Sequence, residues 1–306
     1  MNNVEIDLLK EITGTENGEF EGAYNIRKNG QGIERKITEN VDIVTKKDVS
    51  GIDIHVKPNT KFEYIHIPVI ITESGLNDIV YNDFYIGENS KVTIVAGCGI
   101  HNDHHKDSQH DGIHRFFLEK GAKVKYIEKH YGEGDGAGKR ILNPLTEVYL
   151  KNGAVLEMDS AQIKGVDSSI RTTKGVLEGN SSFIVTEKIM THGEQFAKTI
   201  FEVELNGEGA STKVTSRSVA TDNSKQEFCS KVTGNTKCFG HVECDAIIKD
   251  TAKVIAIPEI VANNVDANLI HEAAIGKIAG EQLTKLMTLG LTEKEAEDAI
   301  INGFLK

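Results

Sequence analysis

A cysteine and a later histidine–glutamate pair are the residues of this chain best suited to metal chemistry. Cys244 lies in the segment His-Val-Glu-Cys-Asp that begins at His241, and His271 and Glu272 follow 27 and 28 residues after it. A thiolate, an imidazole and a carboxylate form a soft-to-borderline ligand set, which can hold iron and sulfide transiently. The set indicates a protein that handles a metal cluster rather than one that converts an organic substrate.

The strand pattern around Cys244 offers a simpler alternative. Val242, Cys244 and Ala246 share one face of a strand, because side chains alternate with a period of two. The thiol is therefore expected to point into the apolar interior. A buried cysteine is ordinarily a small hydrophobic residue, so this pattern by itself leaves both interpretations open.

A second candidate metal site lies between residues 98 and 114. This segment holds one cysteine and five histidines, namely Cys98, His101, His104, His105, His110 and His114. Their spacing is compatible with the binding of zinc or ferrous iron. The segment lacks the fixed Cys/His spacing of a known metal module, so a histidine-rich surface loop between strands is the alternative.

A repeated turn unit indicates which elements position these residues. Units of the form apolar-x-x-Gly/Asn-small-x-apolar begin at Val56, Ile86, Leu118, Leu150 and Leu177, with weaker copies at Leu205, Val232 and Ile248. Each unit reads as a strand end, a tight turn in which Gly or Asn takes a positive φ, and a strand of period two. We expect a mainly β fold of stacked coils, a β-helix or β-solenoid. A β-sandwich is the alternative.

The two ends of the chain carry helical patterns. The apolar spacing over residues 4–12 predicts a helix that ends at Gly14, and residues 280–289 form a second amphipathic segment. Thr292 and Glu295 form a capping box that begins a third helix, expected to bury Ala296, Ala299, Ile300 and Phe304.

The predicted organisation is an N-terminal helical or irregular segment (1–40), a β-helix core (41–268) and a C-terminal helical subdomain (269–306). The helical hairpin would cap the unpaired strand edges of the last coil or dock another protein.

Composition and charge restrict the partners. The 306 residues are 39% hydrophobic, which excludes a disordered chain, and carry a formal net charge of −11. That charge repels phosphate and anionic headgroups, so neither nucleic acid nor a membrane is an expected partner. The N-terminus lacks signal-peptide features, and no apolar run reaches the roughly 20 residues of a bilayer span. We expect a cytoplasmic protein whose four cysteines stay reduced: Cys98, Cys229, Cys238 and Cys244.

Other motifs predict no catalytic site. The glycine-rich segment 132–138 lacks the Gly-Lys-Ser/Thr of a P-loop and the strand-to-helix context that cradles phosphate. No nucleophile elbow or Ser/His/Asp arrangement emerges from the spacing.

The last 65 or so residues resemble a known family. The matching segments are His241-Val-Glu-Cys-Asp-Ala-Ile-Ile248, Ile257-Pro-Glu259, His271-Glu-Ala-Ala-Ile-Gly-Lys-Ile278, Glu281-Gln-Leu283, Leu286-Met287, Gly290-Leu-Thr-Glu-Lys-Glu-Ala296 and Asn302-Gly-Phe304. In this order they look like the C-terminal signature of the SufB/SufD family, and several linked motifs are far more specific than one. The repeat texture extends the resemblance over residues from about 40 to 306.

The resemblance implies a right-handed parallel β-helix whose helical C-terminal subdomain binds the SufC ABC-type ATPase, in a complex that assembles iron–sulfur clusters. Carried over by motif, Cys244 is a scaffold residue for the nascent cluster. Glu272 matches a glutamate implicated on the SufB side, and His271 a histidine used on the SufD side. With all three present, the chain is similar to SufB here. It is expected to be a scaffold rather than an enzyme, served by a sulfur donor and delivering clusters to apo-proteins.

One departure from the family bears on assembly. Members of two-subunit systems carry a long N-terminal helical extension, whereas only some 40 residues precede the first repeat here. This length is similar to the compact single-subunit scaffold of minimal systems in archaea and anaerobes. Such a chain would form a homodimer, in which a site otherwise split between two subunits forms twice or symmetrically.

Two other functions stay open at this point. One is a metal-dependent β-helix enzyme that uses the segment from Cys98 to His114 to activate water. The other is a metal-free structural adaptor for the ATPase.

Overall fold

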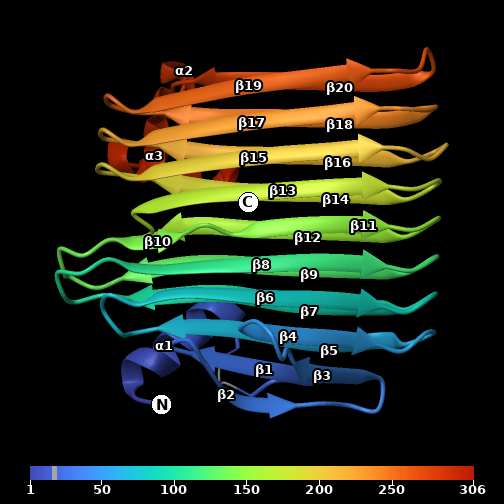
Figure 1. Cartoon of the computed structure of the whole chain (residues 1–306). Helices are drawn as coiled ribbons and strands as arrows, with labels where there is room; N and C mark the ends of the chain where they lie inside the picture. Colours follow the sequence, from blue (N-terminus) through green and yellow to red (C-terminus); the bar gives the residue numbers. More distant parts are fainter. Residues whose placement is uncertain (16–18) are drawn as a thin grey trace.

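The computed structural model describes residues 1–15 and 19–306 and consists mainly of two β-sheets that face each other (Figure 1). The chain alternates between the sheets, and most strands pair in parallel with the strands two positions earlier and later, as β14 does with β12 and β16. This alternation stacks one coil on the next and makes the β-solenoid predicted from the repeat. The sandwich alternative is wrong, because sandwich sheets are antiparallel.

The strands of the first sheet, sheet A, are in spatial order β2 (Gln31–Lys36), β1 (Ala23–Lys28), β5 (Lys61–Ile71), β7 (Lys91–His101), β9 (Lys123–Glu133), β12 (Val155–Lys164), β14 (Ser182–Thr191), β16 (Ser211–Ala220), β18 (Cys238–Ile248) and β20 (Ala267–Gly276). Those of sheet B are β19 (Lys253–Ala262), β17 (Lys225–Gly234), β15 (Phe196–Leu205), β13 (Ser168–Leu177), β10 (Arg140–Leu142) followed along the chain by β11 (Leu145–Leu150), then β8 (Ser108–Leu118), β6 (Asn77–Ile86), β4 (Gly51–Val56) and β3 (Val41–Thr45).

The strands extend beyond the predicted core of residues 41–268 at both ends. At the start, β1 pairs in parallel with β5 and so belongs to sheet A. At the end, β20 continues to Gly276, and the helices begin only at Gly280. His271 and Glu272 therefore lie on a strand, where neighbouring residues face opposite sides.

The predicted turn residues adopt the left-handed backbone. The five strong repeat units place Asn59, Asn89, Gly121, Gly153 and Asn180 at their turns, with φ values of 64°, 55°, 66°, 70° and 55°. Asn and Gly tolerate this region better than other residues. The same turn therefore recurs coil after coil, which keeps successive strands in register.

In most strands, every second residue faces the space between the sheets. Most of these residues are apolar and fully buried, and the largest include Phe84, Phe116, Phe183 and Phe201. Phe84 stacks on Phe116 of the next coil with 4.5 Å between ring centroids. Packing between like residues of adjacent coils holds the coils together.

Polar side chains interrupt this apolar interior along the solenoid axis. Nε2 of His114 lies 3.3 Å from the side-chain amide of Asn82, and its Nδ1 lies 2.8 Å from the Tyr126 hydroxyl. That hydroxyl in turn donates to Glu128 over 2.8 Å. All four side chains are buried.

Arg171 on β13 continues the polar contacts into later coils. Its guanidinium donates to Glu128 (2.6 Å) and to Nδ1 of His130 (3.2 Å), and its Nε lies 3.8 Å from a carboxylate oxygen of Glu187. Glu187 accepts hydrogen bonds from two hydroxyls further on. We call this set the interior polar chain; its members are Asn82, His114, Tyr126, Glu128, His130, Arg171, Glu187, Thr199 and Ser216.

Burial determines the protonation states of the ionisable groups in the interior polar chain. Loss of hydration lowers the pKa of His114 to about 4 and also lowers the pKa of His130, so both rings are neutral near pH 7. Burial raises the pKa of Glu128, but the charge of Arg171 and the contacts with His130 and His114 together hold the pKa of this carboxyl well below its usual range. The interior therefore contains a firmly ionised Arg171–Glu128 pair flanked by neutral imidazoles.

The N-terminal helix α1 (Asn3–Thr13) packs on the outer face of sheet A, against β5, β7 and β9. It confirms the helix predicted at residues 4–12. Leu8 and Ile12 are buried against the strands. Gly97 and Gly99 on β7 allow this close approach, because a Cβ at residue 97 would lie 2.9 Å from the Cβ of Ile12.

The C-terminal helices α2 (Gly280–Thr288) and α3 (Glu293–Phe304) lie beside the coils rather than across the last one (Figure 1). The capping box of α3 is present as predicted. Of the four residues expected to be buried in this helix, Ala296 is fully buried and Ala299 is exposed. The helix contacts sheet A where the guanidinium of Arg217 lies over the Phe304 ring.

The last coil is consequently left uncovered, contrary to the cap expected from the sequence. Its strands β19 and β20 are the edge strands of the two sheets. Apolar side chains on them are exposed, among them Ile257 (54%), Ile260 (46%) and Ile275 (39%). Among the residues that the structure describes, no helix is long and apolar enough to cross a membrane.

The buried ion pair leads to a test of stability. We expect Arg171→Met to lower the free energy of unfolding by about 3–5 kcal/mol, because it leaves Glu128 charged and unpaired in the interior. Adding Glu128→Gln should restore part of the loss. Chemical denaturation would measure both.

Arg115→Met is the matched control for this measurement. It removes an ion pair with Glu147 near the surface and a longer contact with Asp83 (3.7 Å), which keeps its own pair with Lys46, so the loss should be at most about 1 kcal/mol. An equal loss in the two arginine variants would contradict the role assigned to Arg171.

The neutral interior histidines predict sensitivity to acid. The pKa of His114 is about 4 in the fold against 6.5 when it is unperturbed. Below pH 6.5, His114 is protonated in the unfolded chain but stays neutral in the folded chain. The free energy of unfolding therefore falls as the pH drops from 6.5 to 4. One such histidine accounts for about 3 kcal/mol over this interval.

His114→Gln should therefore flatten the dependence of the unfolding free energy on pH between 6.5 and 4. His105→Gln, on the exposed rim, should leave it unchanged. Denaturation curves at several pH values would measure this dependence. Identical slopes of unfolding free energy against pH for wild type and His114→Gln would contradict the assignment.

Candidate functional site

Cys244 lies on β18 with its side chain inside the solenoid, as the period of two predicts. It is 2% exposed, and Val242 and Ala246 on the same face are also buried. Its neighbours in the parallel register are Ser216 of β16 and Ala273 of β20. The thiol is therefore buried one strand away from the open end of sheet A.

His271 lies on the same side of the sheet as Cys244. It pairs in register with Val242, whose side chain points inward. Both of its ring nitrogens are buried without a hydrogen-bond partner in the described part of the chain. A buried polar atom without a partner is costly, so this imidazole has free capacity to bind a ligand.

Glu272 faces the opposite way. Its register partner is Glu243, on the outer face of β18, and its side chain is 64% exposed. Its carboxylate lies 3.4 Å from Nε2 of His241. The structure thus brings Cys244 and His271 to the interior side and leaves Glu272 outside, beside His241.

His241 begins the motif that contains Cys244 but was not predicted to be a ligand. Its Nε2 is buried and makes no hydrogen bond within the described residues. The available signal was its position, since residues 241 and 243 share the outer face of a strand whose edge neighbour carries Glu272.

The surroundings of Cys244 connect it to the interior polar chain. Ser216, its register neighbour, donates to Glu187 over 2.9 Å. Burial raises the pKa of Cys244 to about 12, and the negative charges of Glu187 and Asp245 add to the rise. The thiol is therefore protonated in this conformation, and it becomes a metal ligand only if its surroundings change or a metal displaces the proton.

Glu187 was also missed, although the sequence carried a signal for it. Phe183, Val185, Glu187 and Ile189 alternate along β14, so the period of two places a carboxylate among inward apolar residues. Burial raises the pKa of Glu187. This buried carboxyl group is thus connected, through its hydrogen bond from Ser216, to the register neighbour of Cys244.

The second predicted set divides into two locations. Cys98 on β7 and His110 and His114 on β8 are buried and line one interior cavity. His101 lies at the rim, where its ring nitrogens contact Asp103 (2.8 Å) and Glu133 (3.1 Å). The segment is therefore no single loop, because only residues 102–107 connect the two strands.

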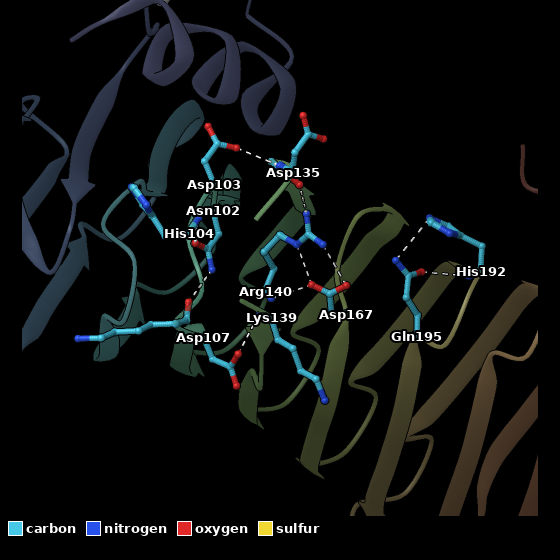
Figure 2. A network of polar contacts seen from close by, with 12 residues as sticks. Asn102, Asp103, His104, Asp107, Asp135, Lys139, Arg140, Asp167, His192 and Gln195 are labelled. Atoms are coloured by element: carbon cyan, nitrogen blue, oxygen red, sulfur yellow. Dashed lines mark hydrogen bonds and ion pairs between the residues drawn. The ribbon is translucent and has the colours of Figure 1, made fainter. Parts of the chain in front are cut away.

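Figure 2 shows the rim beside this segment, where backbone and carboxylate groups tie successive loops together. Asp103 accepts from the backbone of Asp135 (3.0 Å), and Arg140 donates to Asp167 (2.7 and 3.1 Å). A Cβ at Gly136 would lie 2.3 Å from the backbone of residue 104. The glycines of segment 132–138 thus serve loop stacking, and Asp103, Asp107 and Asp167 are each paired with a backbone or guanidinium group of another residue at this rim.

The remaining cysteines lie apart from Cys244. Cys229 is half-buried on the outer face of β17, and Cys238 is buried at the start of β18. In the described ranges, no three Cys, His, Asp or Glu side chains already converge as metal ligands. The described part of the chain therefore places a thiol and an imidazole on the inward side of sheet A near its open end.

Comparisons with known proteins agree with this architecture. Residues 69–304 match the family described as "SUF system FeS cluster assembly, SufBD core domain". An iron–sulfur cluster assembly SufBD family protein of Methanocaldococcus jannaschii is 32% identical over 257 residues, which cover 82% of this chain and 79% of that protein.

Longer relatives match as well. A SufBD family protein of Methanothermobacter thermautotrophicus is 27% identical over 84% of this chain and 63% of its own length, and SufB of Bacillus subtilis is 24% identical over 72% of this chain and 47% of its own length. The chain thus spans about half to four-fifths of the proteins to which it is compared. On the family match, which covers most of the coils and both C-terminal helices, the chain belongs to the SufBD core family of SUF-system iron–sulfur cluster assembly proteins.

Proposed function

We propose that this chain is the scaffold of a SUF-type assembly complex and holds a nascent iron–sulfur cluster at the open end of its solenoid. Cys244 supplies the thiolate and His271 the imidazole. The observation that carries the proposal is an inward thiol one strand from an uncovered coil, on the same side as an imidazole whose two nitrogens have no hydrogen-bond partner among the described residues. Thiolate and imidazole are ligands that suit iron.

Glu272 does not face this site within a single chain. It lies on the outer face in one chain, next to His241. A second copy of the chain at the open end would present its own β20 and its own Glu272, so the oxygen ligand can come from the partner. We therefore propose a homodimer, formed where β19 and β20 leave backbone edges and isoleucine side chains uncovered.

We assign the C-terminal helices to the docking of an ATPase of the SufC type. Helix α2 has no buried residue, and Leu286 and Met287 lie on its surface. Helix α3 is anchored to sheet A through Phe304 on Arg217 and Glu297 on Lys249. A partner that moves these helices acts on β16 and β18, the strands of Ser216 and Cys244.

The buried thiol of Cys244 requires a conformational change before it can bind iron. Cys244 is protonated and shielded from solvent in this conformation. Twisting of the last coils by the ATPase would open the site to iron and sulfide, and their binding would displace the thiol proton. In this scheme the chain performs no turnover, and ATP hydrolysis takes place in the partner.

Replacement of the thiol tests the ligand assignment. Cys244→Ser should lose most of the iron and sulfide that the parent chain accumulates during anaerobic reconstitution, because a hydroxyl is a poor ligand for iron–sulfur clusters. Cys229→Ser, on the outer face, is the matched control and should reconstitute normally. Visible absorption and the iron and sulfide content are the readouts. Full reconstitution of Cys244→Ser would contradict the assignment of Cys244 as a ligand.

Replacement of an isoleucine at the open end tests the homodimer. Ile275→Asp places a carboxylate on the uncovered end and should weaken self-association at least tenfold, whereas Ile79→Asp, equally exposed on β6, should leave it unchanged. Sedimentation velocity over a concentration series measures both. A monomeric parent chain, or equal weakening by the two substitutions, would overturn this interface.

A further inference from the structure

We propose that the interior cavity lined by Cys98 and His110 is a second metal site, which takes one divalent cation of borderline softness through Cys98 Sγ and His110 Nε2. The expectation that the cation is ferrous iron rests on the proposed function. The existence of the site is argued from the residues that line the cavity.

The cavity lies between the two sheets in the first half of the solenoid. It has a volume of about 10 Å³, room for the centre of a single water molecule or ion. Its lining includes five side chains of metal-binding types, all at least nine-tenths buried: Cys98, His110, His114, Glu128 and His130. A small enclosed space with this lining suits a single cation.

Three of the five side chains are already engaged. His114 uses one nitrogen toward Tyr126 and the other toward Asn82. Nδ1 of His130 accepts from Arg171, which also holds Glu128. Cys98 Sγ and His110 Nε2 make no hydrogen bond within the part of the chain that the structure describes.

Asp78 orients His110 as a ligand. Nδ1 of His110 lies 3.1 Å from Asp78, and Arg27 holds that carboxylate through two hydrogen bonds of 3.0 and 2.6 Å. With the ring proton on Nδ1, facing this carboxylate, the lone pair of the imidazole lies on Nε2. This carboxylate–histidine arrangement is typical of metal-binding imidazoles.

Gly112 keeps the space in front of this lone pair open. A Cβ at residue 112 would lie 3.4 Å from Nε2 of His110 and 3.2 Å from Nε2 of His114. Gly112 also lines the cavity, between the two histidines on β8. Any other residue here would fill the volume that a cation would occupy.

With only two free protein ligands, the site should bind a metal ion transiently rather than hold a structural ion. Structural zinc sites use four protein ligands, and among residues 1–15 and 19–306 no three such side chains converge here. Water, sulfide or another small ligand would complete the coordination. The site is separate from Cys244, because five strand spacings of sheet A, about 24 Å, separate β7 from β18.

Anaerobic titration of the full chain with cobalt(II) chloride, followed by ferrous iron, tests the site. We use the Cys244→Ser chain as background, so that failure of the cluster assignment cannot affect the result. One equivalent of cobalt should produce a thiolate charge-transfer band. The added Cys98→Ser should abolish the band, and the added His110→Gln should weaken binding at least tenfold.

Gly112→Ala supplies a second arm that removes no ligand. It should abolish or strongly weaken binding by filling the cavity, and Cys229→Ser should leave binding unchanged. Circular dichroism and thermal melting show whether each variant is folded. A cobalt–thiolate band that persists in folded Cys98→Ser, or a Cys244→Ser chain that binds no cobalt, would overturn the proposal whatever the outcome of cluster reconstitution.

Discussion

The alternation of side chains along in-register parallel strands is the constraint on which the rest of the structure depends. Each residue of a strand either faces the narrow space between the sheets or faces outward, and the same position in the next coil faces the same way. Cys244 is inside because Val242 and Ala246 are inside. Glu272 is outside because it follows His271 by one residue on β20.

The same constraint makes polar residues in the interior costly, and the chain meets that cost by pairing them. Arg171 and Glu128 stand 43 residues apart and meet inside the solenoid at 2.6 Å. The hydroxyls of Thr199 and Ser216 satisfy Glu187. The interior polar chain is thus held by contacts between its own members, beside the apolar residues that pack the rest of the interior.

The open end has the opposite character. Its isoleucines and strand edges lack the cover that ends of solenoids normally carry. The C-terminal helices lie alongside, attached by few side chains, and α2 buries none of its residues. Within the described chain, the stack of coils thus ends in two edge strands, β19 and β20, that the C-terminal helices do not cover.

The sequence by itself determined the local features of this protein. Its repeat units predicted the turns at Asn59 and Gly121, its period of two predicted the inward thiol of Cys244, and its capping box predicted the start of α3. The opposite facing of His271 and Glu272 was also available, but it required the assignment of residues 267–276 to a strand rather than to the helical subdomain.

Only the tertiary structure decided which residues meet across coils. Cys98, His110 and His130 line one cavity because β7, β8 and β9 stack in a particular register, whereas His101 lies at the rim. It also decided that the helices leave the last coil open. The physical reason is that turn chemistry and alternation act within a few residues, while the neighbours of a side chain in the next coil depend on coil length and on the packing of the whole stack.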